Sequence, residues 1–284
     1  MKLKKWGFIL LIGLLLTALA ACGTSDLPEE STSANDGEDV EENTEVDDNS
    51  ESEEEAEPES EDNVLRMATS ADFPPFESFD ESGEFIGFDI DLANIVADEL
   101  GYELEIDDMN FDGLIGSLQS GRADIVLAGM SATEERSENV DFSPAYHHSG
   151  EMFITQPDSD ITSIEDIEGL TVGVQLGTIQ EEGAKTLQEE YDFEIKQLDE
   201  ATGIVQELLT NRIDVGYLDK TVAEGYIEEQ DLAGFDDPTT ASPGMAIAFP
   251  KDSEYYEEVS EVIEQLLEDG TIADLEEKWG LDEQ

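Results

Sequence analysis

The chain has 284 residues, with 74 Asp and Glu against 12 Lys and Arg, and a formal net charge of −62 at pH 7. This balance argues against nucleic acid as a partner, because phosphate binding needs clustered cations. It also argues against attachment to anionic lipid through a polybasic segment. The single cysteine excludes an internal disulfide and a cysteine-rich zinc site.

The N-terminus predicts an exported protein. Three lysines within the first five residues precede the apolar run WGFILLIGLLLTALAA, which is shorter than the roughly 20 residues of a membrane span and typical of a secretory signal. The run ends in Leu-Ala-Ala before Cys22, a pattern that resembles the lipobox of bacterial lipoproteins. The resemblance implies a signal peptide over residues 1–22, lipidation of Cys22, and a membrane anchor on the extracellular face. An ordinary signal peptide with an incidental cysteine is the alternative.

Residues 23–63 predict a disordered acidic tether. They hold 19 acidic residues and no Lys or Arg, with too few large apolar side chains to offset the entropy of ordering. As a flexible coil the segment would span about 35 Å. A spacer between membrane and folded domain is the favoured interpretation, and an acidic tail that binds a partner is the alternative.

The folded region begins with alternating strand and helix patterns. Gly101 and Gly121 each follow an amphipathic stretch and predict the ends of two helices. We expect a strand at 64–69, a helix at 91–100 led in by 85–89, a strand through Tyr102, Leu104 and Ile106, a helix through Leu114, Ile115 and Leu118, and a strand at 125–128.

A second series of the same kind follows, with strands expected at 171–175, 194–197 and 213–218 and helices at 178–190 and 202–209. The segments LIGSLQSGRADIVLAG and IVQELLTNRIDVGYLD share one order: a helix, Gly-Arg or Asn-Arg, one residue, Asp, then an apolar strand. The alternation predicts an α/β fold with mostly parallel sheets. The repetition favours two lobes of similar build, with Asp124 and Asp214 as structural anchors of equivalent loops.

Four stretches resemble a known family: TSADFPPFESFDESGEFIGFDIDLANIVADELG, FDGLIGSLQSGRADIVLAGMSATEERSENVDFSPAY, LTVGVQLGTIQEEG and NRIDVGYLD. They are similar to the polar amino-acid-binding proteins of ABC importers, the family 3 extracellular solute-binding proteins. The resemblance implies a periplasmic-binding-protein type II fold over residues 64–284, with two α/β lobes joined by a two-strand hinge. Lobe 1 is expected at 64–153 and 248–284, and lobe 2 at 154–247. A ligand would be held between the lobes, whose hinged closure a permease recognises.

Arg136 is the leading candidate for the site. Thr133 is a good N-cap, which places Arg136 at the third helical position, where a cation opposes the helix dipole. A local rule broken in a chain with few cations suggests function. Arg136 and the free N–H groups of that helix start can clamp a carboxylate, and the resemblance implies the same role. Ser131 and Gly129 are expected beside it, while pairing of Arg136 with one of the many acids is the alternative.

Lobe 2 offers three further candidates. Asp219 follows an apolar strand, at the sheet edge where α/β proteins bind ligands, and the resemblance implies that it receives an α-ammonium group. Thr178 and Gln180, in GTIQ at a helix start, could complete the shell around a carboxylate. Ile179 departs from the commoner Gly-Thr-Thr pattern of the family, which removes one hydroxyl from the expected lobe 2 contacts.

The ligand's side chain is less well defined by the sequence. Phe73 and Phe111 match the family's aromatic walls, which can sandwich an aliphatic stem or attract a cation. Ser70 stands where some binders of basic amino acids carry an aspartate, and Glu77 could replace that charge. Arginine, lysine, glutamine, histidine and cystine stay open as ligands.

We expect a binding protein and not an enzyme, with no cofactor or metal. His147 and His148 are expected to be ordinary histidines of the surface or the pocket rim, since adjacent strand residues face opposite ways and no third ligand is evident. The expected partners are a free amino acid, an ABC permease with its ATPase subunit, and the membrane through Cys22; a monomer is expected. A cyclohexadienyl-type dehydratase on the same fold is the alternative, and a sensor or receptor-channel relative is a third reading.

Overall fold

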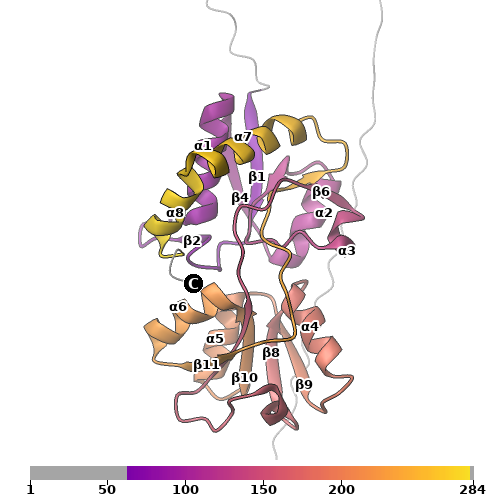
Figure 1. Cartoon of the computed structure of the whole chain (residues 1–284), viewed down its shortest axis with the longest axis vertical. Coiled ribbons are helices and arrows are strands. Elements are labelled where there is room, and N and C mark those ends of the chain that lie inside the picture. The colour runs from indigo at the N-terminus through magenta and orange to yellow at the C-terminus, as the bar shows by residue number, and fades with distance from the viewer. Residues whose placement is uncertain (1–62, 282–284) are drawn as a thin grey trace, which may run out of the picture. The chain divides into compact units, whose positions relative to one another are not determined.

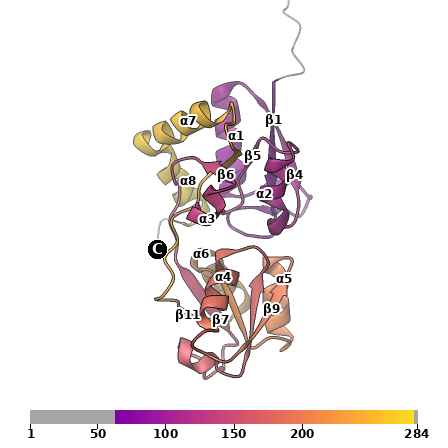
Figure 2. The same cartoon turned by 90° about the vertical axis from the view of Figure 1, so that its right-hand side faces the viewer.

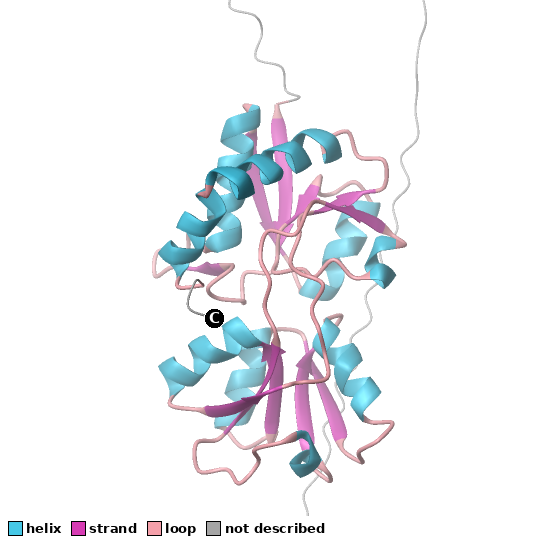
Figure 3. Cartoon of the chain, viewed as in Figure 1, coloured by secondary structure: helices cyan, strands magenta, loops and turns pink. Residues whose placement is uncertain are grey.

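The computed structural model describes residues 63–281, which form two α/β lobes (Figures 1 and 3). The expected signal peptide at 1–22, with Cys22, and all of the expected tether at 23–63 except Asn63 lie outside the described residues. Within 63–281, no helix is both long enough and apolar enough to cross a bilayer.

The sheet of lobe 1 has five strands, in the order β4-β1-β5-β12-β6. β1 is parallel to β4 and β5, whereas β12 is antiparallel to β5 and β6. The bounds are β1 Val64–Thr69, β4 Glu103–Asp108, β5 Ile125–Val126, β6 Val140–Phe142 and β12 Ala248–Pro250. A small hairpin of β2 (Ser78–Phe79) and β3 (Phe85–Ile86) precedes the first helix.

Helices cover both faces of this sheet. α1 (Phe88–Leu100), α7 (Tyr256–Asp269) and α8 (Thr271–Trp279) contact one another and bury Leu92, Val259 and Ile263 in one core cluster. α2 (Leu114–Gln119) covers the other face with Leu114 and Leu118. η1 (Phe111–Gly113) precedes α2, and α3 (Glu134–Ser137) precedes β6.

The predicted elements of lobe 1 are present with shifted ends. α1 begins at Phe88, three residues before the predicted Asp91, because Phe88 and Asp89 are buried and belong to its first turn. It ends at Gly101, which adopts a φ of 76° and confirms the predicted C-cap. β5 ends at Val126, two residues earlier than predicted, since Leu127 and Ala128 are buried but lead into a loop.

Lobe 2 repeats the arrangement with strand order β9-β8-β10-β7-β11. β8 is parallel to β9 and β10, whereas β7 is antiparallel to β10 and β11. The bounds are β7 Glu151–Thr155, β8 Thr171–Gln175, β9 Glu194–Leu198, β10 Val215–Asp219 and β11 Ala233–Asp236. α5 (Ala201–Leu209) and α6 (Lys220–Gln230) pack on one face, and α4 (Ile179–Leu187) and η2 (Ile164–Ile167) on the other (Figure 2).

The two lobes share one local interaction, in which an aspartate exchanges two hydrogen bonds with the backbone of a neighbouring strand. Asp124 accepts a hydrogen bond from the backbone N–H of Arg66 at 3.0 Å, and its own N–H donates back to the Arg66 carbonyl. Asp214 does the same with Thr171, accepting at 2.9 Å. Each aspartate ties the loop before one strand to the start of its neighbour, which supports the predicted anchoring role.

Two loops, 143–150 and 237–247, connect the lobes and lie side by side (Figure 1), paired by a bridge between His147 and Met245. All of β7 belongs to the second sheet, so the chain has entered lobe 2 by Glu151. The sequence placed this entry at 154, three residues late, because the buried run EMFIT is a single strand. The return is complete at Ala248, the first residue of β12.

Candidate ligand-binding site

A cavity lies between the lobes, at the carboxyl ends of β1, β5, β8 and β10. This is the edge at which open α/β sheets bind ligands. All ten residues that the sequence singled out for ligand binding line it, together with four that it did not. The lining residues are Ser70, Asp72, Phe73, Glu77, Phe111, Ala128, Gly129, Ser131, Arg136, Gln175, Thr178, Ile179, Gln180 and Asp219.

Arg136 sits in this cavity without a carboxylate partner. Thr133 caps α3 by accepting a hydrogen bond from the Arg136 N–H at 3.1 Å, as the sequence predicted. The guanidinium donates to two backbone carbonyls, Ser131 in lobe 1 at 2.8 Å and Gly177 in lobe 2 at 3.0 Å. No ion pair joins it to any residue in the described part of the chain. The described residues therefore offer no carboxylate that pairs with Arg136 as the alternative required.

Burial lowers the pKa of Arg136 to about 10, and Glu182 and Glu135 act against that shift. The guanidinium is still protonated at neutral pH. A half-buried cation with no counterion among the described residues, in a protein this acidic, can receive an anionic group of a ligand.

Aromatic rings form walls on the lobe 1 side. The Arg136 guanidinium lies over the ring of Phe111, 5.3 Å from its centroid, and Phe111 is the first residue of η1. Phe73 packs against Gly129, where any Cβ would lie 2.8 Å from the Phe73 ring. Gly129 also has a φ of 53°, so glycine is required there for both conformation and space.

Glu77 is completely buried and faces the cavity. Neither of its carboxylate oxygens accepts a hydrogen bond from a described residue. Its neighbour Asp89 accepts from the Gly129 N–H at 2.8 Å and from the Tyr146 hydroxyl at 2.9 Å. Burial, and then repulsion from Asp89, raise the pKa of Glu77 well above its usual range. A cationic ligand group would relieve this destabilised carboxylate.

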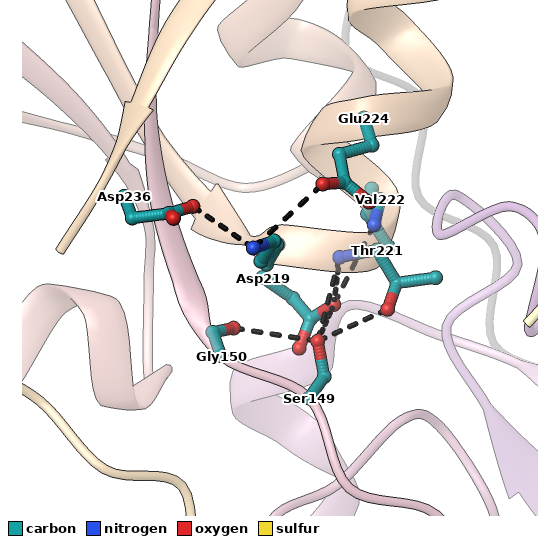
Figure 4. Close-up of polar contacts among 8 residues, drawn as sticks. Ser149, Gly150, Asp219, Thr221, Val222, Glu224 and Asp236 are labelled. Carbon is teal, nitrogen blue, oxygen red and sulfur yellow. Dashed lines mark hydrogen bonds and ion pairs between the residues drawn. The ribbon is translucent and has the colours of Figure 1, made fainter. Parts of the chain in front are cut away.

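Asp219 is the last residue of β10 and the N-cap of α6. Its Oδ1 accepts from the backbone N–H of Thr221 at 2.9 Å and from the Ser149 hydroxyl at 2.9 Å (Figure 4). The adjacent Lys220 pairs instead with Asp236 at 3.1 Å and Glu224 at 3.8 Å. No cation among the described residues therefore pairs with Asp219. Burial raises the pKa of Asp219 to about 7, against the hydrogen bonds that lower it.

The other predicted lobe 2 side chains are already hydrogen-bonded. The Thr178 hydroxyl donates to the Gln175 carbonyl at 2.7 Å and accepts from the Glu181 N–H at 3.2 Å, as the N-cap of α4. Gln180 donates from its amide to Glu151. Burial, and then the charge of Asp219, raise the pKa of Glu151 to about 9. Thr178 and Gln180 therefore shape the cavity wall in lobe 2.

Four lining residues were missed. Gln175 ends β8, so the strand-end rule that selected Asp219 could have found it. Ala128 and Ile179 are apolar neighbours of predicted residues. Asp72 lies between Ser70 and Phe73, but Gln175 and Ala201, two of its hydrogen-bond partners, are in lobe 2, and no sequence pattern brings these segments together.

The histidines differ from expectation. His147 is not at the rim or surface: it is buried, packs against Phe76 with ring centroids 5.3 Å apart, and shares a 2.8 Å hydrogen bond with Glu276. Its position in a connecting loop between two lobes explains the burial. His148 is exposed as expected. No metal-binding cluster is found within residues 63–281. Trp279, the last residue of α8, packs against the lobe 1 core and donates from its indole N–H to Asp91 at 2.7 Å.

Comparison with known proteins places this geometry in a family. The model of the bacterial extracellular solute-binding proteins, family 3, matches residues 65–282. The chain belongs to this family. The arginine-binding extracellular protein ArtP of Bacillus subtilis (strain 168) is 38% identical over 280 residues, which cover 98% of both chains.

Solved structures of similar proteins have the same fold. An ancestral arginine-binding protein bound to arginine is 38% identical, with a TM-score of 0.73 over 76% of this chain and 98% of that one. The ancestral amino acid-binding protein AncCDT-1, a precursor of cyclohexadienyl dehydratase, is 36% identical, with a TM-score of 0.71 over 76% of this chain and 95% of that one. The periplasmic-binding-protein type II fold predicted from the sequence is confirmed.

Proposed function

We propose that this family 3 solute-binding protein captures an amino acid with a cationic side chain, arginine first, and delivers it to an ABC importer. The observation that carries the proposal is the charge pattern of the cavity. The half-buried guanidinium of Arg136, which has no counterion, lies in the same cavity as two buried carboxylates that have no cationic partner, Asp219 and Glu77. That absence refers to the residues that the structure describes.

Each charge matches one group of the ligand. Arg136 binds the α-carboxylate in a charge-assisted hydrogen bond. Asp219 accepts the α-ammonium at the carboxyl edge of the lobe 2 sheet. Glu77 takes the side-chain cation, while Phe73 and Phe111 enclose the aliphatic stem. A cationic side chain would stabilise the ionised form of Glu77, whereas a neutral side chain such as that of glutamine would gain no such charge interaction. In this arrangement Glu77 supplies the negative charge, so an aspartate at the position of Ser70 is not needed.

Isothermal titration of the purified protein with arginine, lysine, histidine, glutamine and cystine tests the proposal. Arginine is expected to bind most tightly. Agmatine keeps the guanidinium and lacks the α-carboxylate, so it is expected to bind at least about 100-fold more weakly because Arg136 loses its partner. Tightest binding of a neutral amino acid would overturn the assignment of Glu77.

The same titration addresses the dehydratase alternative. If no amino acid binds and the protein instead turns over a cyclohexadienyl substrate, the receptor assignment fails. Because the AncCDT-1 relative is described as a precursor of cyclohexadienyl dehydratase, a turnover assay with a cyclohexadienyl substrate accompanies the titration.

We also propose that the protein acts as a monomer at the extracellular face of the membrane, anchored through Cys22. The support is the lipobox-like sequence and the extracellular family. Mass spectrometry of protein from the membrane fraction is expected to find a lipid on Cys22. Cys22→Ser is expected to release the protein from membranes; retention of that variant would contradict the anchor.

A further inference from the structure

Asp72 of lobe 1 makes direct contacts with two elements of lobe 2. It lies in the loop that follows β1, and its Oδ2 accepts a hydrogen bond from the backbone N–H of Ala201, the first residue of α5. The same oxygen accepts from the Gln175 amide at the end of β8, at 3.3 Å. Its Oδ1 accepts from the Ser70 hydroxyl at 3.0 Å. Both oxygens are thus occupied by protein donors.

The contact with Ala201 supplies something that α5 lacks within its own lobe. The N-cap position of α5 is Glu200, whose side chain makes no capping hydrogen bond. The first N–H groups of a helix need acceptors, and the helix dipole favours a negative charge at that end. Asp72 meets both needs from the opposite lobe. This stabilisation exists only when the lobes are together.

We infer that Asp72 is an interlobe latch, which caps α5 across the cleft, holds the two lobes together and slows release of the bound solute. Its role differs from that of Arg136, whose bond to the Gly177 carbonyl also crosses the cleft but comes from the group that we assign to the solute carboxylate. It differs too from Glu77, whose oxygens accept no hydrogen bond from described residues. Asp72 is thus a positioning residue that acts on closure and not on solute identity.

The surroundings are consistent with an ionised latch at neutral pH. Burial raises the pKa of Asp72 to about 6 and Glu200 adds to the rise, while the donors Ala201, Ser70 and Gln175 lower it. The carboxylate therefore keeps its charge at pH 7.5, where the test is made.

The test compares Asp72→Ala with Asp107→Ala in the full-length protein. Asp107 is an exposed aspartate on β4 of the same lobe, so its removal changes the net charge equally without touching lobe 2. Hydrogen exchange by mass spectrometry reports on the start of α5, and stopped-flow measures the dissociation rate of arginine. The exchange measurement is made without arginine, so it stands even if the proposed ligand is wrong.

For Asp72→Ala we expect faster exchange at the start of α5 and roughly tenfold faster release of arginine, with the ratio of arginine to glutamine affinity unchanged. Asp72→Asn, whose amide oxygen can still accept from Ala201, should lie between wild type and Asp72→Ala and covers the case in which the alanine variant does not fold. Unchanged exchange and release rates would overturn the latch. A changed affinity ratio would also overturn it, because Asp72 would then be a contact of the solute.

Discussion

The two lobes are built alike and differ at the mouth of the cavity. Their five-stranded sheets have the same order and the same pattern of parallel and antiparallel neighbours. Lobe 1 presents Arg136, whose guanidinium donates hydrogen bonds to two backbone carbonyls. It also presents Glu77, whose oxygens accept no hydrogen bond from the described residues. Lobe 2 presents Thr178 and Gln180, whose side-chain polar groups already bond within that lobe.

This difference shows how one fold can divide recognition from closure. Lobe 1 keeps two charged groups incompletely satisfied, which costs stability and is compensated when a ligand of opposite charge binds. Lobe 2 has a mostly satisfied surface that covers the ligand and adds Asp219. We expect most of the discrimination among amino acids to come from lobe 1.

Arg136→Ala is the substitution expected to have the largest effect on ligand binding. The α-carboxylate would then be buried without its cation, which costs about 3–5 kcal/mol and weakens binding of every amino acid more than roughly 100-fold. Isothermal titration measures the loss. Arg122→Ala, an exposed arginine of lobe 1 beyond the end of α2, is the matched control and should bind like wild type. An effect below about tenfold for Arg136→Ala would remove lobe 1 from its leading role.

The pH dependence of arginine affinity measures the contribution of Asp219, the charged residue that lobe 2 adds to the cavity. Asp219 has a pKa of about 7, and the α-ammonium requires its ionised form. Protons compete with the ligand below pH 7, so arginine affinity should rise about tenfold between pH 6 and pH 8 from this group alone. Titrations in buffers of different ionisation enthalpy should show proton release, to which Glu77 also contributes because its pKa is raised. Asp219→Asn keeps a good N-cap and should reduce the slope of the profile to the contribution of Glu77. A slope equal to that of wild type would assign the effect to a group other than Asp219.

The smallest expected effect is the loss of stability when Asp124 or Asp214, the equivalent loop anchors of the two lobes, is replaced. Asp124→Ala removes both a backbone hydrogen bond and an ion pair with Arg66 at 2.7 Å, whereas Asp214→Ala removes a backbone hydrogen bond to Thr171. We expect losses of about 1–2 kcal/mol and about 1 kcal/mol in the free energy of unfolding, respectively. Urea unfolding of the two variants tests this order. A greater loss of stability for Asp214→Ala than for Asp124→Ala would contradict this order and show that the two loops contribute differently despite their similar hydrogen bonds.

Much of the site could be predicted because its residues occupy rule-governed positions. Asp219 follows a strand at the carboxyl edge, and Arg136 stands at a helix position that disfavours cations. Both signals are local, so one sequence is enough to find them. The lobe repeat was visible for the same reason, in the spacing that places Asp124 and Asp214 before equivalent strands.

The misses depend on contacts between distant segments. Asp72 meets Ala201 across 129 positions, and His147 is buried because a connecting loop runs beside Met245 and Glu276. Neither pairing leaves a local pattern. The hydrogen bonds that occupy Thr178 and Gln180 were hidden for a related reason, since Glu151 reaches Gln180 from another strand.

The central claim is that Glu77 selects a cationic side chain, and arginine against citrulline measures it most directly. The two amino acids have nearly the same shape and differ in side-chain charge. Wild type should bind arginine at least about 100-fold more tightly than citrulline, whereas Glu77→Gln should bring the two within about threefold. Glu84→Gln, an exposed glutamate of lobe 1, should keep the wild-type ratio. An undiminished preference for arginine in Glu77→Gln would contradict the account.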